Sequence, residues 1–403
     1  MGEWGKVALR GRGSAIAAVV ALAVALAVVA GGLGIAQRPG TVPPDGQGQC
    51  PPGTTEIRPG RCAAPELPPP SILDYRPRPT LVVAEHKVPR AKFPVIDIHS
   101  HTGPTPETID RLIAEMDALN LRVLVNLSGG DASAVKQKVD FIRSSKYPDR
   151  FRVFANVSFQ GAGGPGWAER AVADLEQAVR NGAIGLKVFK NLGLRARKAD
   201  GARLRVDDPA LKPVWEACAR LDVPVLIHVG EPQEFFSPLD NHNERWLELA
   251  LFPDRRHYMP GEPTFEELMN ERDAMFLDNP KTRFINAHFG WYGNDLARAG
   301  RLLDRAPNVV MDLSAVLYDF GRQPRAAREF FIKYQDRVLF GKDSYAPSEF
   351  PYYWRVFETA DEYFDYYRDY HAFWKLYGMD LPDEVLRKVY SANARRVTPG
   401  LPR

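Results

Sequence analysis

Two histidines that could share a metal ion end an apolar run at residues 95–101, which reads Val-Ile-Asp-Ile-His-Ser-His. Side chains of a strand alternate between its two faces, so His99 and His101 are expected to point the same way. Imidazole nitrogen binds borderline divalent metals at roughly 2.0–2.1 Å. The following Gly103-Pro104 pair would end the strand. The pair alone is equally compatible with two structural histidines, so the choice depends on the rest of the chain.

Further polar residues of the same kind stand at or near the ends of other apolar runs. Lys187 lies near the end of residues 183–189, and His228, His288 and Asp343 each end a later run. If these runs are the parallel strands of a barrel, their carboxyl ends meet at one face, where barrel enzymes place their chemistry. A chance scatter would put some of these groups on helices or loops. We therefore predict that all of them converge with His99 and His101.

From residue 93 onward, short apolar runs alternate with segments of helical periodicity. The expected strands are residues 95–101, 122–127, 151–157, 183–189, 223–228, 283–288, 308–313 and 337–343, and the expected helices are residues 106–120, 132–145, 167–181, 209–221, 265–277, 295–305, 325–334 and 383–394. Eight such units predict an α/β fold, a (β/α)8 TIM barrel with its parallel sheet covered by helices. A doubly wound open sheet is the alternative, but no glycine-rich nucleotide turn follows the first strand.

Four of these stretches together resemble the amidohydrolase superfamily, in the branch called amidohydrolase-related or amidohydrolase 2. They are residues 96–101, 224–228, 284–290 and 339–344, and the resemblance extends over residues 93–398. The resemblance implies that His99, His101, His228 and Asp343 bind the metal, and that His288 acts in catalysis or contacts a second ion. Members of this branch include hydrolases of C–N and C–O bonds and non-oxidative decarboxylases.

The resemblance also gives Lys187 two alternative roles. In some relatives a lysine at the end of the fourth strand forms a carbamate with carbon dioxide that bridges two ions. In one-metal members the ammonium faces an anionic group of the substrate. We favour one metal, with Lys187 as a substrate contact and His288 as the catalytic base. Lys190, three positions further on, is expected on the opposite face of the strand.

A site of three histidines and one carboxylate leaves a position open for water or a substrate oxygen. A metal held there lowers the pKa of water and polarises a carbonyl, while Asp343 could accept a proton and His288 could act as general acid or base. Zinc suits this ligand mixture, and manganese or iron stays open. We therefore predict a metal-dependent hydrolase of the amidohydrolase type, acting on a C–N or C–O bond of a small molecule. A metal-dependent decarboxylase and a catalytically idle envelope binding protein are the alternatives.

The N-terminus precedes the barrel and has a different composition. Residues 15–36 are uncharged and rich in alanine, valine and leucine, and three basic residues stand before them, at positions 6, 10 and 12. Such a basic flank stays in the cytoplasm and sends the rest of the chain outside. The run exceeds a signal-peptide core of roughly 7–15 residues. We predict a cytoplasmic flank and transmembrane anchor at residues 1–36, with cleavage and secretion as the alternative.

The next segment, residues 37–92, is dense in proline and is predicted to be an extended extracytoplasmic linker before the barrel at residues 93–403. Cys50 and Cys62 lie in this linker and are expected to form a disulfide in an oxidising compartment. Cys218 lies on a helical apolar face and is expected to be a buried thiol. With 53 basic and 50 acidic residues, the charge balance gives no sign of a nucleic-acid partner, and a homo-oligomer stays open.

Two segments outside the repeating pattern are expected near the site. Residues 231–262 form a long insertion after the fifth strand, and we predict that it lines the substrate site. His242 and His257 within it are expected at the surface rather than as ligands. The aromatic tract at residues 350–374 is predicted mainly to pack on the barrel, with the part nearest Asp343 facing the site.

Overall fold

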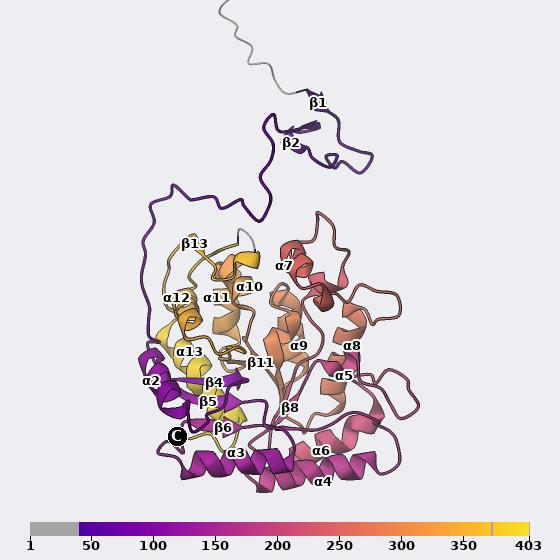
Figure 1. Ribbon diagram of the computed structural model, residues 1–403, viewed down its shortest axis with the longest axis vertical. Coiled ribbons are helices and arrows are strands. Elements are labelled where there is room, and N and C mark those ends of the chain that lie inside the picture. The colour runs from indigo at the N-terminus through magenta and orange to yellow at the C-terminus, as the bar shows by residue number, and fades with distance from the viewer. Residues whose placement is uncertain (1–39, 372–373, 403) are drawn as a thin grey trace, which may run out of the picture. The chain divides into compact units, whose positions relative to one another are not determined.

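The computed structural model describes residues 40–371 and 374–402 of the chain, so the predicted membrane anchor lies outside the described residues. Within the described part, no helix is long and apolar enough to cross a membrane. The chain divides into two compact units, Met1–Pro77 and Arg78–Arg403 (Figure 1).

The described part of the first unit holds a small antiparallel sheet. Its strands are β1 (Thr41–Val42), β2 (Thr55–Arg58) and β3 (Arg61–Ala63), in the order β1-β3-β2. The predicted disulfide between Cys50 and Cys62 is present. A crosslink removes conformational freedom from the unfolded loop, which allows so short a segment to fold. The predicted linker is therefore not extended throughout.

The second unit contains all eight predicted strands, each parallel to its neighbours. They are β4 (Val95–Ser100), β5 (Leu121–Asn126), β6 with β7 (Phe151–Val153 and Ala155–Asn156), β8 (Leu186–Val188), β9 (Val225–Ile227), β10 (Phe284–Asn286), β11 (Val309–Asp312) and β12 (Val338–Leu339). The third strand is interrupted at Phe154, so β4-β5-β6 and β7 through β12 form two runs in chain order. The barrel closes where Ser100 bridges to Asp343 and the Ile98 amide donates to the Phe340 carbonyl at 3.1 Å.

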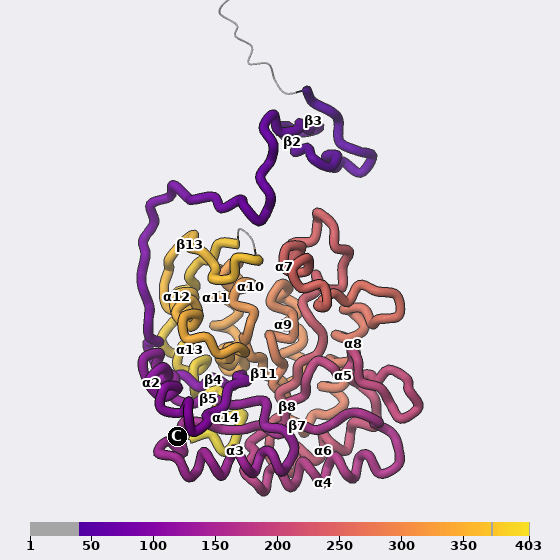
Figure 2. Tube along the Cα trace, viewed as in Figure 1, coloured from indigo at the N-terminus to yellow at the C-terminus, as the bar shows by residue number. Residues whose placement is uncertain are grey.

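The helices between the strands agree with the predicted segments to within a few residues at most ends. They are α2 (Ile109–Leu119), α3 (Ala132–Ser144), α4 (Trp167–Arg180), α6 (Lys212–Arg220), α8 (Phe265–Asp278), α9 (Leu296–Arg305), α11 (Pro324–Lys333), α13 (Asp383–Arg387) and α14 (Asn393–Val397). A π-helical turn at Lys388–Ala392 separates the last two, which were predicted as one helix. Figure 2 traces this alternation from β4 to α14. Shorter elements are α5 (Asn191–Leu194), α7 (Trp246–Leu251), α10 (Leu317–Arg322), α12 (Phe350–Glu358), β13 (Phe364–Asp365) and β14 (Lys375–Leu376).

The barrel strands are buried on both faces, which explains their nearly continuous apolar sequences. Alternate residues such as Ile96 and Ile98 fill a cluster inside the barrel, whereas Val95 belongs to a larger cluster that includes helix residues. Cys218 is buried in this larger cluster, as predicted. This rigid sheet fixes the positions of the side chains at the strand ends.

Candidate active site

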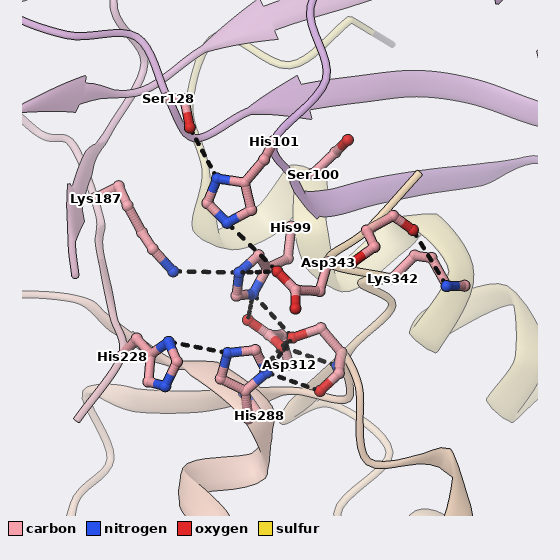
Figure 3. A network of polar contacts seen from close by, with 12 residues as sticks. His99, Ser100, His101, Ser128, Lys187, His228, His288, Asp312, Lys342 and Asp343 are labelled. Carbon is pink, nitrogen blue, oxygen red and sulfur yellow. Dashed lines mark hydrogen bonds and ion pairs between the residues drawn. The ribbon is translucent and has the colours of Figure 1, made fainter. Parts of the chain in front are cut away.

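The first strand and the last strand bring three predicted residues together (Figure 3). His99 is completely buried at the end of β4, and its Nε2 lies 3.5 Å from Oδ1 of Asp343. Nε2 of His101 lies 3.4 Å from the same oxygen. Nδ1 of His101 contacts the Ser128 hydroxyl at 2.8 Å, which holds the ring in this orientation. His99 and His101 therefore face one carboxylate, as the alternation of strand side chains predicts.

A glycine allows the last strand to approach His99 this closely. A Cβ atom on Gly341 would lie 2.8 Å from the Cβ of His99, a distance that real Cβ atoms do not tolerate. The Asp343 amide donates to the His99 carbonyl at 2.6 Å, and Asp343 itself has a left-handed backbone with φ 77°. Such a conformation is costly for a residue other than glycine, and strain of this kind gathers at functional sites.

His288 and His228 complete the group from the neighbouring strands. Nε2 of His288 lies 3.1 Å from Nδ1 of His228. His288 follows β10 at φ 54° and begins a left-handed turn that continues through Trp291. Ligand atoms of His99, His288 and Asp343 all lie within 4.8 Å of one another, which is compact enough to hold a metal ion. His101 and His228 contact members of this trio on either side.

Two residues that the sequence analysis missed orient these rings. Oδ2 of Asp312, at the end of β11, lies 2.9 Å from Nδ1 of His99, and the Ser314 hydroxyl lies 2.9 Å from the same nitrogen. The Ser314 carbonyl accepts from Nδ1 of His288 at 2.9 Å. With both Nδ1 atoms engaged, the Nε2 atoms of His99 and His288 are left to face the site. Asp312 could have been found, because it ends an apolar run just as His228 and His288 do.

The protonation states suit a cation. Burial lowers the pKa of His99 to about 4 and also lowers the pKa values of His228 and His288, so all three rings are neutral at pH 7. Burial alone would raise the pKa of Asp343, but its hydrogen bond to His101 and the nearby rings lower it, so the carboxylate is ionised. Neutral imidazoles and an ionised carboxylate are the forms that bind metal, and the residues present therefore fit a divalent ion.

Lys187 lies on β8, and its side chain reaches the group at the end of the barrel. The side chain is buried and its Nζ lies 3.2 Å from Nε2 of His99. Burial lowers the pKa of Lys187 to about 8. The prediction for Lys190 is wrong, because β8 ends at Val188 and strand alternation no longer applies beyond it. Lys190 pairs with Glu231 and borders the same cavity as His228.

A cavity of about 280 Å³ opens over the histidines. Its walls are formed by Lys190, His228, Glu231, Pro232, Phe235, Arg245, Glu248, Arg255, His288, Trp291, Ala315, Tyr318, Asp343, Ser344, Arg368 and Tyr370. Six of these belong to the insertion at residues 231–262, so the predicted contribution of this segment to the pocket is confirmed. A larger cavity of about 440 Å³, bordered by residues such as Val139 and Val179, contains none of the candidate residues.

The histidines of the insertion and the aromatic tract can be compared with their predicted positions. His242 is exposed, as predicted, but His257 is buried, because its ring stacks on Phe236 with centroids 5.2 Å apart. Most of the aromatic tract packs on the barrel, as predicted: Tyr353 and Trp354 of α12 are fully buried. The residues of the tract that reach the cavity are Arg368 and Tyr370, near its far end, and not the part nearest Asp343 in sequence, so this detail of the prediction is wrong.

Comparison with known proteins identifies the family. The family model for amidohydrolases of the amidohydrolase-2 type matches residues 96–399, which is most of the chain. The chain belongs to the amidohydrolase family. The resemblance drawn from the four sequence stretches is thereby confirmed. The matched region includes every predicted site residue, and the predicted anchor and linker lie outside it.

Several solved structures are similar to this chain. A 2,6-dihydroxybenzoate decarboxylase from Rhizobium is 18% identical with a TM-score of 0.48, over 76% of this chain and 98% of that one. A dihydroxybenzoic acid decarboxylase from Polaromonas sp. JS666, with bound manganese and 2-nitroresorcinol, is 16% identical with a TM-score of 0.46, over 76% and 96% of the two chains. A 4-oxalomesaconate hydratase from Rhodopseudomonas palustris is 16% identical with a TM-score of 0.44, over 76% and 96%. Among curated protein sequences, none matches this chain closely enough to count as a relative.

Proposed function

We propose that this protein is a metal-dependent hydrolase that cleaves a C–N or C–O bond of a small-molecule substrate. The observation that carries the proposal is the convergence of His99, His288 and Asp343, whose ligand atoms lie within 4.8 Å of one another beside a cavity. Binding alone would not require neutral histidines and an ionised carboxylate gathered at the carboxyl ends of barrel strands. This arrangement therefore favours an enzyme over an idle binding protein.

In this proposal the metal would be held by His99, His101, His228 and Asp343. The Nε2 atom of His288, which lies within 4.8 Å of the ligand atoms of His99 and Asp343, is left unbound as the proton carrier. When bound, a divalent ion supplies a Lewis acid that polarises a substrate carbonyl and makes water a better nucleophile at neutral pH. Zinc agrees with a site of nitrogen and oxygen ligands, and the same ligands accept manganese or iron.

The remaining residues orient the reacting groups and move protons. The Nε2 atom of His288 lies beside the ligand atoms and is unprotonated at neutral pH, so it can accept a proton from water and return it to the leaving group. Asp312 and Ser314 hold the ring of His99 in one tautomer. Lys187 contributes a cation next to His99, where it can contact an oxygen of the substrate.

Metal analysis of the purified full-length chain tests the ligand assignment. We expect His99→Ala together with His101→Ala to remove the metal, and His228→Ala to weaken its binding. His288→Ala should keep the metal and lose turnover. Full metal content in the double variant would rule out the site, and loss of metal in His288→Ala would make His288 a ligand instead of the proton carrier.

Isotope labelling tests the reaction type. In water enriched in oxygen-18, a hydrolase incorporates the label into one product of each turnover. A decarboxylase on the same residues would release carbon dioxide from the substrate and leave the organic product unlabelled at the reacting carbon. If turnover releases carbon dioxide and the organic product does not incorporate the label, the reaction is decarboxylation and not hydrolysis.

We also propose that the barrel is exported and tethered to the membrane by the N-terminal segment. The apolar composition and basic flank of residues 1–36 support this location. The disulfide between Cys50 and Cys62 supports an oxidising compartment.

A further inference from the structure

The cavity over the candidate site has a positively charged wall. Four cationic side chains border it, and three of them are held by carboxylates of the insertion. Lys190 contacts Glu231. Arg245 and Arg255 both bind Glu248, with Nη2 to Oε2 at 2.5 Å and Nη1 to Oε1 at 2.6 Å respectively. These three cations are therefore already engaged within the protein.

Arg368 is the fourth cation and has a different environment. Among residues 40–371 and 374–402, no carboxylate lies within ion-pairing distance of its guanidinium. The group instead lies over the rings of Tyr367 and Tyr370, with centroid distances of 5.5 and 6.0 Å. Burial raises the pKa of Tyr367 well above its ordinary value, so this phenol is neutral and does not balance the charge.

The charged groups near Arg368 do not neutralise it either. Lys342 is the neighbouring cation, and the charge of Arg368 contributes to lowering its pKa, after the larger effect of burial. Lys342 in turn occupies the carboxylate of Glu349. A partly buried cation without a carboxylate partner loses hydration, and the ring contacts of Arg368 bring no opposite charge in return, so it favours an anionic ligand.

The net charge of the cavity wall also favours an anionic ligand. Asp343 is assigned to the metal and is left out of this count. The remaining charged residues of the wall are four cations and two carboxylates, Glu231 and Glu248, so the wall has a net charge of +2. Aromatic side chains, among them Phe235, Trp291 and Tyr318, supply apolar surface between the charges. The cavity volume of about 280 Å³ is of a size that suits a small molecule.

From these observations we infer that the substrate is a small carboxylic acid whose carboxylate pairs with Arg368, while its scissile group lies at the histidines and Asp343. One unpaired guanidinium matches one negative charge, and its planar fork fits the two oxygens of a carboxylate. The inference rests on the proposed function, because it assigns the substrate class of the same cavity.

A matched pair of probes tests this assignment by calorimetry on the metal-containing, full-length protein. Benzohydroxamate binds metal sites through its hydroxamate, and 3- and 4-carboxybenzohydroxamate add a carboxylate on the far side of the ring. We expect at least one carboxylated probe to bind the wild type about tenfold or more tightly than benzohydroxamate, the range for a hydrogen bond to a charged group. Arg368→Gln should abolish this preference, and Arg368→Lys should retain part of it.

The controls separate a binding role from a structural one. Affinity for plain benzohydroxamate should be unchanged in Arg368→Gln, because that probe does not reach the guanidinium. Arg180→Ala, on the exposed face of α4, should keep the full carboxylate preference. Equal binding of all probes by the wild type, no binding of the carboxylated probes, or an undiminished preference in Arg368→Gln would each overturn the inference. A preserved preference in a protein that hydrolyses nothing would leave the inference standing and remove the proposed reaction.

Discussion

Oδ2 of Asp312 lies 2.9 Å from Nδ1 of His99, and both side chains are completely excluded from solvent. Burial would raise the pKa of Asp312, but its contacts with His99, His288 and Ser314 lower it, so the carboxylate is ionised. An anion at this position fixes the ring proton on Nδ1 and strengthens Nε2 as a ligand. The pair therefore links the seventh strand of the barrel to the candidate metal site on the first.

We predict that Asp312→Asn weakens metal binding by about 10–100-fold, the usual cost of changing a residue that orients a metal ligand. The amide cannot hold the Nδ1 proton as a carboxylate does, so the wrong ring tautomer becomes accessible. Metal titration by competition with a chelator measures the change. Asp140→Asn, an exposed change on α3, is the matched control and should bind metal normally. Unchanged affinity in Asp312→Asn would show that the pair serves only the fold.

Lys187→Ala decides how many ions the site holds. Under the one-metal proposal the variant keeps one bound ion and loses turnover by about 10–100-fold, because a charged contact to the substrate is removed. Metal analysis counts the bound ions, native mass spectrometry detects added mass on the lysine, and initial rates measure turnover. Lys136→Ala, exposed on α3, is the control. Two ions in the wild type, fewer in the variant, and the added mass of carbon dioxide on the wild-type lysine would establish the two-metal alternative.

Mild acid should destabilise the metal-free protein through buried histidines. Burial lowers the pKa of His371 to about 4, whereas an unfolded chain has a histidine pKa near 6.5. Between these values the unfolded state binds more protons, so the free energy of unfolding falls as the pH decreases. Between about pH 6.5 and 5, His371→Asn should show a decline shallower by up to about 1 kcal/mol per pH unit. Urea unfolding at several pH values measures this.

The control for the pH experiment is His242→Asn, because His242 is exposed and folding changes its environment little. The free energy of unfolding of His242→Asn should follow that of the wild type at every pH. If His371→Asn shows the same slope as the wild type, His371 is protonated in the folded protein and the buried neutral ring is ruled out.

Export can be followed with a reporter and with thiol chemistry. A reporter fused after Arg403 should be active outside the cytoplasm, as the basic flank before residues 15–36 predicts. Cys50 and Cys62 should resist alkylation until a reductant is added. A Cys50→Ser variant, which leaves Cys62 unpaired, provides the positive control for labelling. Rapid labelling of both cysteines in untreated wild type would contradict the oxidising compartment.

The sequence carried most of the information about the barrel. Its strands are short and apolar because both faces are buried, and the helices between them have a clear period, so both could be located. The interruption of the third strand at Phe154 was not predictable, because the ring of Phe154 packs against Gly185, where a Cβ atom would lie 2.4 Å away, and no local pattern shows this contact. The sheet at residues 41–63 was also missed, since its two-to-four-residue strands lie among prolines.

The positions of site residues were predictable where the residue ends a strand, and less so where a loop determines the position of the side chain. His99, His101, Lys187, His228, His288 and Asp343 were located from strand ends alone. Lys190 and His257 were placed wrongly, because the chain beyond β8 and within the insertion follows no regular alternation. Arg368 lies even further from any strand pattern. Only the folded arrangement shows that it borders the cavity and that none of the described carboxylates pairs with it.

The bridge between Ser100 and Asp343 closes the barrel. Asp343 is a proposed metal ligand, and Ser100 stands between two others, His99 and His101. A ribosome makes the first strand early and the last strand near the end of translation, so a growing chain has His99 and His101 long before it has Asp343. The complete set of ligands exists only after the final strand has joined the first. If the chain crosses the membrane unfolded, the ion is selected from whatever metals are present where the barrel closes, rather than from the cytoplasmic supply in which the chain is made.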